Sequence, residues 1–214
     1  MKRVVIALAL ILSASVVYGS FAPKANEPFS LLKKKKKKGA FKQGQISIHI
    51  GMGIILKADY KDVDYSIFGT NEVKKKLPFN MMFDYGVAPM LSMGLYMGFY
   101  GESITVTDNT DPGNIYGIEN KFKQFGLRTT YHQYMDGKLD PYAVLTLGFN
   151  KCKGTAMSEL KGNNVLLLNP YTGGFMWGIQ AGANIYFTDN IGAYVEAGYG
   201  KWLPIINLGA AVKF

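Results

Sequence analysis

Residues 45–54 read Gln-Ile-Ser-Ile-His-Ile-Gly-Met-Gly-Ile, and an apolar side chain stands at every second position. A period of two places alternate side chains on opposite faces of a β-strand, and an α-helix does not reproduce it. Strands of soluble sheets usually have about five or six residues, whereas about ten tilted residues cross a membrane. The stretch therefore predicts a β-strand of membrane-spanning length.

The same alternation recurs seven times further along the chain. The additional predicted strands lie at residues 80–87, 92–100, 124–132, 142–149, 174–187, 191–199 and 205–214. Short turns are predicted near Pro89, at Asp136-Gly137 and at residues 188–190. Long connections are predicted at residues 57–78, 106–120 and 151–170, with a brief fourth one at 201–204. Outer-membrane barrels show this asymmetry, so we predict an all-β fold, an eight-stranded antiparallel transmembrane up-and-down β-barrel over residues 43–214.

The chemistry of the second strand face argues against a soluble barrel or sandwich. That face is rich in glycine and in small or polar residues, which suit a narrow lumen filled by side chains. Aromatic residues near the strand ends are expected to form girdles at the two membrane interfaces. These residues are Phe79, Tyr85, Trp177, Phe187, Tyr199, Trp202 and Phe214.

Two segments precede the predicted barrel. Lys2 and Arg3, followed by an apolar stretch too short to span a bilayer, predict a secretory signal peptide over residues 1–20. Residues 21–42 carry the hexalysine run Lys33 to Lys38 and little apolar content, which predicts a disordered Lys-rich periplasmic linker. The run is interpreted as a solvated tether, and binding to anionic lipid head groups is the alternative.

The composition excludes several classes of function. The net charge is +9, but the leader and the hexalysine run account for all of it except +1, so we predict no nucleic-acid binding. The single cysteine, Cys152, excludes a disulfide framework. The sequence has no metal-ligand spacing and no phosphate-binding glycine loop followed by a helix, so no metal and no cofactor are expected.

Charged and polar side chains are predicted inside the barrel. Arg128 is the only arginine outside the leader, and alternation points it into the lumen together with Asp84 and Glu196. This lumen charge network is interpreted as structural, with a gate that switches partners as the alternative. Further inward polar residues are His49, His132 and Gln180. No catalytic residue is assigned, although a Ser–His–acid group of His49 with Ser47 and Asp84 stays open.

The last ten residues, Ile205 to Phe214, alternate up to a terminal phenylalanine. Ala210, Val212 and Phe214 resemble the membrane-insertion signal of outer-membrane barrels. The chain resembles the small outer-membrane β-barrel proteins of the porin-like family, and is similar in plan to the OmpA transmembrane domain, OmpX and OmpW. The resemblance implies the outer membrane of a Gram-negative bacterium, reached by secretion to the periplasm. It implies as partners the barrel-insertion machinery, outer-membrane lipid and lipopolysaccharide.

Three functions are compatible with these patterns. The leading hypothesis is a non-enzymatic barrel that acts in envelope integrity or binds a surface ligand through long extracellular loops. The loop residues that suggest binding are Tyr60, Tyr65, Phe68 and Tyr116 beside Asp59, Asp62, Asp64 and Asp111. The second hypothesis is a narrow porin-like channel or small-solute transporter, although five inward tyrosines at 96, 100, 142, 186 and 194 should fill much of the lumen. The third is a lipid-modifying enzyme.

Overall fold

A computed structural model describes residues 40–56, 69–108, 115–135, 137–159 and 173–214. Every regular element in this part of the chain is a β-strand, and no helix there is long and apolar enough to cross a membrane. The nine strands are β1 (Ile46–Leu56), β2 (Gly69–Lys75), β3 (Phe79–Ala88), β4 (Leu91–Asp108), β5 (Ile115–His132), β6 (Leu139–Glu159), β7 (Gly174–Tyr186), β8 (Ile191–Lys201) and β9 (Pro204–Lys213).

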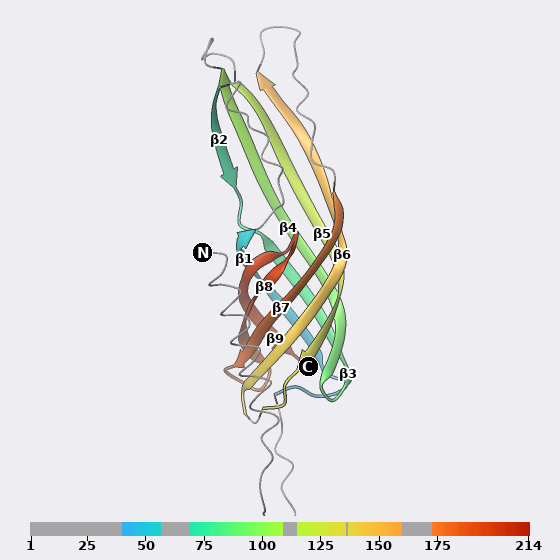
Figure 1. Cartoon of the computed structure of the whole chain (residues 1–214). Coiled ribbons are helices and arrows are strands. Elements are labelled where there is room, and N and C mark those ends of the chain that lie inside the picture. Colours follow the sequence, from blue (N-terminus) through green and yellow to red (C-terminus); the bar gives the residue numbers. More distant parts are fainter. Residues whose placement is uncertain (1–39, 57–68, 109–114, 136, 160–172) are drawn as a thin grey trace, which may run out of the picture.

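Eight of these strands close into an antiparallel barrel (Figure 1). β1 pairs with β3 on one side and with β9 on the other, and each remaining barrel strand pairs with its neighbours in chain order. The predicted eight-stranded up-and-down barrel is therefore confirmed. β2 is an addition, because it lies within the predicted 57–78 connection and pairs only with the upper part of β4.

Three neighbouring strands are much longer than a membrane crossing requires. β4, β5 and β6 have 18, 18 and 21 residues, whereas about ten suffice. Their upper halves rise above the rest of the barrel and form, with β2, a four-stranded sheet that we call the extension (Figure 1). The predicted loops 106–120 and 151–170 are therefore partly strand, because the outward side chains there become polar while the backbone ladder continues.

Side chains are distributed inside out relative to a soluble protein. The outer surface carries apolar residues such as Phe149, which is 69% exposed, while the inside holds charged ones such as Arg128, which is 1% exposed. Apolar residues facing outward and polar residues facing inward are what a transmembrane barrel requires. The outer face carries an aromatic row at the upper border of this apolar belt, with edge-on ring contacts in the pairs Phe99–Phe125, Phe149–Phe175 and Trp177–Tyr199.

The β8–β9 turn closes the upper mouth of the barrel. Trp202 was predicted to join the interfacial girdle, but it is only 6% exposed and folds inward beside Phe122. Its φ of 70° lies in the left-handed region, which redirects the chain into the lumen. Leu203 is buried next to it, and a Cβ on Gly178 would lie only 2.4 Å from Leu203 Cδ1. The prediction for Trp202 was wrong because alternation does not hold through a tight turn.

The lower mouth is filled by residues just before β1. Ala40 and Phe41 are buried, and the ring of Phe41 stacks on His132 with ring centroids 3.6 Å apart. Gly44 donates its backbone N–H to the Gly86 carbonyl, which fixes the segment to β3. Ala40 and Phe41 stand at the end of the predicted linker, and the structure places their side chains in the lower mouth of the barrel. The predicted signal peptide and the rest of the linker lie outside the described residues.

Candidate functional site: the lumen network

Arg128 occupies the centre of the barrel. Alternation along β5 points it inward, where Nη2 donates to Glu196 Oε1 at 2.7 Å and Nε lies 3.1 Å from Asp84 Oδ1. Tyr142 donates its hydroxyl to the same Glu196 oxygen at 2.9 Å. The two carboxylates come from β3 and β8, so one guanidinium joins three strands. The structure thus brings together the three residues of the predicted charge network.

His49 connects this group to a second polar cluster below it. Its Nδ1 lies 3.7 Å from Asp84 Oδ2, and its Nε2 lies 3.0 Å from Asn184 Oδ1. The Asn184 amide in turn donates to Asp140 Oδ2 at 2.9 Å. Since that amide oxygen can only accept, the Nε2 of His49 carries a proton and donates it.

His132 is the centre of the lower cluster. Its Nδ1 lies 2.9 Å from Asp140 Oδ1, and its Nε2 lies 3.0 Å from Ser92 Oγ. A carboxylate only accepts, so Nδ1 of His132 carries a proton and donates it to Asp140. Ser92 and Asp140 were not singled out in the sequence. Their inward parity on β4 and β6 was the available signal.

These contacts form one continuous polar chain, which we call the lumen network. It runs through Ser92, His132, Asp140, Asn184, His49, Asp84, Arg128, Glu196 and Tyr142. Its members come from β1 and β3 to β8. The remaining barrel strand, β9, also has a polar contact in the lumen. Asn80 on β3 accepts a hydrogen bond from Tyr194 and donates one to Asn207 on β9. Every strand of the barrel therefore contributes to the polar interior.

Ser92, His132 and Asp140 have the connectivity of a serine hydrolase triad, which is recognised by geometry and not by sequence position. The alternative grouping around His49 does not form, because Ser47 accepts a hydrogen bond from Gln45 while His49 is held by Asn184. Ser92 is 0% exposed, and Phe41 covers the His132 ring. The triad-like group is therefore closed to a substrate in this conformation.

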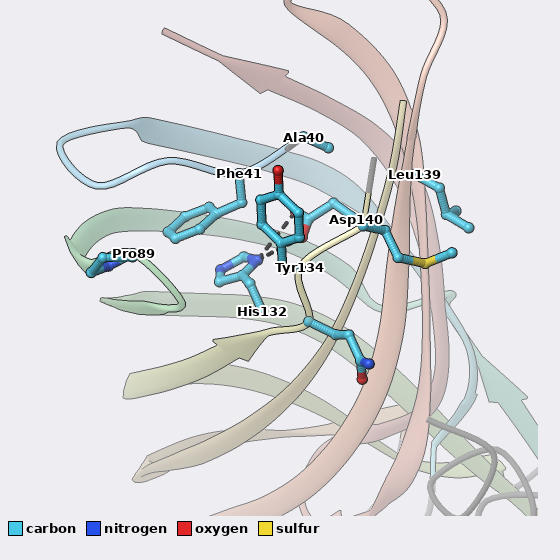
Figure 2. A pocket seen from close by; sticks show the side chains of 9 residues that line it. Ala40, Phe41, Pro89, His132, Tyr134, Leu139 and Asp140 are labelled. Carbon is cyan, nitrogen blue, oxygen red and sulfur yellow. Dashed lines mark hydrogen bonds and ion pairs between the residues drawn. The ribbon is translucent and has the colours of Figure 1, made fainter. Parts of the chain in front are cut away.

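A small cavity lies beside His132 at the lower mouth (Figure 2). Phe41, Pro89, Tyr134 and Asp140 are among its lining residues, and its volume of about 10 Å³ accommodates roughly one water molecule. Figure 2 shows Phe41 beside the His132 ring on the side away from the ion pair with Asp140. The cavity is too small for an organic ligand.

The remaining predicted residues lie elsewhere. Gln180 faces the upper lumen and donates to the Pro204 carbonyl at 3.1 Å. Ala210, Val212 and Phe214 lie at the seam where β9 meets β1, and Phe214 exchanges two backbone hydrogen bonds with Ile46. The suggested loop-binding residues lie outside the described residues, apart from Tyr116, whose backbone alone is described. In the described ranges no three His, Cys, Asp or Glu side chains group as metal ligands.

Comparison with known proteins identifies similar folds but no related sequence. No protein-family profile matches the chain, and no characterised protein matches it significantly in sequence. The N-terminal β-barrel domain of Pseudomonas aeruginosa OprF aligns over 83% of this chain and 100% of its own, with 16% identity and a TM-score of 0.47. The outer-membrane protein OprG from Pseudomonas aeruginosa aligns over 81% of this chain and 97% of its own, with 13% identity and a TM-score of 0.48. Ail, the attachment invasion locus protein of Yersinia pestis, aligns over 80% of this chain and 99% of its own, with 16% identity and a TM-score of 0.41.

The central ion pairs should dominate the stability of the barrel. Replacing Arg128 by methionine leaves Asp84 and Glu196 buried without their cation, and breaking a buried pair in this way costs about 3–5 kcal/mol. We expect urea unfolding of the refolded barrel in micelles to show this loss. The exposed control Lys201→Met should unfold like the wild type, and adding Asp84→Asn and Glu196→Gln to Arg128→Met should restore much of the loss. An Arg128→Met protein with an unchanged midpoint contradicts the analysis.

Proposed function

We propose that this chain is an integral outer-membrane barrel protein of a Gram-negative envelope, whose sealed barrel holds the extension outside the cell for surface binding or envelope integrity. The observation that carries the proposal is the length of β4, β5 and β6 beyond the apolar belt. Long strands that continue into water expose side chains for contact with other molecules. A barrel that served only as a membrane anchor would not need the upper halves of β4, β5 and β6.

The arrangement of the two barrel ends supports the proposed orientation. The short β3–β4, β5–β6 and β7–β8 turns, together with the C-terminus, lie at the end opposite the extension (Figure 1). Outer-membrane barrels place short turns in the periplasm and long connections outside. The sequence adds a predicted secretory leader and a terminal phenylalanine. The extension then faces the medium.

Cysteine labelling on intact cells tests this orientation. In a Cys152→Ser background, Lys74→Cys places a thiol on β2, where the native side chain is 74% exposed. We expect a membrane-impermeant maleimide to label it on whole cells, because the extension lies outside. The matched variant Asp189→Cys, at the opposite end, should react only after lysis. The reverse pattern, or equal labelling before and after lysis, contradicts the proposal.

The channel alternative is opposed by the packing of the lumen. The lumen network crosses the middle, Trp202 and Leu203 close the upper mouth, and Phe41 closes the lower one. We expect planar bilayers containing the refolded full chain to show no discrete conductance steps, with altered heat-dependent gel mobility confirming a folded barrel. Reproducible openings that change in Arg128→Ala would instead assign transport, with the central ion pairs as the gate.

The enzyme alternative rests on the triad-like group of Ser92, His132 and Asp140. A hydrolase needs an accessible nucleophile and donors for the oxyanion, whereas Ser92 is fully buried and Phe41 stacks on its partner His132. We expect a fluorophosphonate probe to give no more labelling of the refolded wild type than of Ser92→Ala. Labelling of the wild type that disappears in Ser92→Ala would establish a reactive serine and favour the enzyme.

A further inference from the structure

Five lysines gather on the outer face of the extension, directly above the apolar belt. Lys121 and Lys123 on β5 face Lys153 and Lys151 on β6 in direct cross-strand register. All four are exposed, and like charges directly opposite each other on a sheet destabilise it. Lys76 joins them from the segment after β2. We call Lys76, Lys121, Lys123, Lys151 and Lys153 the lysine cluster.

Among the described residues, one carboxylate forms ion pairs with this cluster of five lysines. Glu119 lies 3.2 Å from Lys121 Nζ and 3.5 Å from Lys76 Nζ. The hydrogen bond and charge of Lys121 lower the pKa of this carboxyl, and Lys76 adds to the effect. Within the described ranges no ion pair engages Lys123, Lys151 or Lys153. The cluster therefore has a clear excess of positive charge.

Gly101 on β4 allows the fifth lysine, Lys76, to reach the cluster. β4 presents Gly101 opposite Lys121, so that row has a strand position without a side chain. The Lys76 chain crosses this space, with Cδ 3.3 Å from where a Gly101 Cβ would stand. Its ammonium group is thus directed toward Glu119 and the other lysines. An oxyanion on the outer face of the lysine cluster is therefore approached by cations from β5, from β6 and from the segment after β2.

An apolar groove runs down the lipid-facing surface immediately below the lysine cluster. It has a volume of about 470 Å³ and is lined mainly by apolar side chains of β4, β5, β6 and β7. Gly126 and Gly148 are paired at its floor, between Phe125 and Leu127 on β5 and Leu147 and Phe149 on β6. The Phe125–Phe149 pair is two residues below the Lys123–Lys151 pair, a rise of about 7 Å.

We propose that the lysine cluster and this groove form a binding site for a phosphorylated glycolipid of the outer leaflet, of the lipopolysaccharide class. Phosphate groups lie among the five ammonium groups, and one acyl chain occupies the groove beneath them. Ammonium–phosphate contacts are strong charge-assisted hydrogen bonds, and lysines near an anionic membrane surface add to one another. This site rests on the proposed function, because it needs the extension to rise from the outer leaflet.

Charge complementarity favours a glycolipid with several phosphates over a phospholipid. A phospholipid headgroup brings one phosphate, whereas four lysines in two successive cross-strand pairs and Lys76 face a single glutamate. The two lysine pairs lie about 7 Å apart along the strands, so two anionic groups on one sugar headgroup satisfy both pairs. Binding also removes the repulsion within each pair.

Binding of lipid A to the refolded full chain in neutral detergent tests the site. The triple variant Lys123→Gln/Lys151→Gln/Lys153→Gln keeps the groove and removes three charges. We expect its affinity for fluorescent bis-phosphorylated lipid A to fall about tenfold or more. The matched control Lys42→Gln/Lys74→Gln/Lys201→Gln removes the same charge elsewhere and should stay within about twofold of the wild type. Heat-dependent gel mobility shows that each variant folds.

Each contrary outcome overturns a defined part of the proposal. If the cluster variant binds lipid A as tightly as the wild type, the proposed site is rejected. If the control triple loses as much affinity as the cluster variant, binding depends on net charge alone and not on the position of the lysines. Phosphatidylglycerol binding as tightly as lipid A rejects the glycolipid. Glucosamine 1-phosphate, which has no acyl chain, binding as tightly as lipid A rejects the groove. Surface labelling of Lys74→Cys is independent of these results, so failure of the site and failure of the proposed orientation are distinguishable.

Discussion

A polypeptide that crosses lipid must satisfy every backbone N–H and C=O group internally, because no water is available there. β1 meets this constraint by pairing with β3 and, across the whole length of the chain, with β9. The terminal Phe214 and Ile46 exchange the last backbone bonds of that seam. Within the membrane-spanning part, closure removes both sheet edges and creates a narrow lumen. The polar side chains that point into this lumen must then form hydrogen bonds with one another.

Eight strands enclose too little space for bulk water, so inward polar groups must satisfy one another. Arg128 bridges carboxylates from opposite sides, and His49 and Asn184 carry the hydrogen bonding down to His132. Ser92, His132 and Asp140 therefore have the hydrogen-bond connectivity of a hydrolase triad within a network that packs the lumen. Ser92 is fully buried, so this connectivity does not by itself provide a nucleophile that a substrate can reach. The same crowding explains why short segments at both mouths suffice to close the barrel.

The barrel is asymmetric in the direction across the membrane. β4, β5 and β6 continue as a water-exposed sheet, whose edge is extended by β2, while the opposite side of the barrel ends near the interface. At the transition the outward residues change from Phe125 and Phe149 to Lys123 and Lys151 within one step of the alternation. Apolar surface and positive charge therefore meet on a single face, as an amphipathic lipid requires.

The sequence alone determined the strand period, the number of barrel strands and the inward parity of Arg128, Asp84 and Glu196, because alternation and turn residues are local properties. It missed β2 and the upper halves of β4 to β6, where outward positions such as Lys121 and Lys123 are polar and buried apolar residues such as Ile104 and Ile118 lie on the inward face. The apolar-outward pattern of the membrane strands ends there, although the hydrogen bonds between the strands continue. It placed Trp202 outside, since a left-handed turn residue breaks the parity. The pairing of Ser92 with His132 and Asp140, and of Lys123 with Lys151, was decided only by tertiary structure, because register between strands fixes which side chains meet.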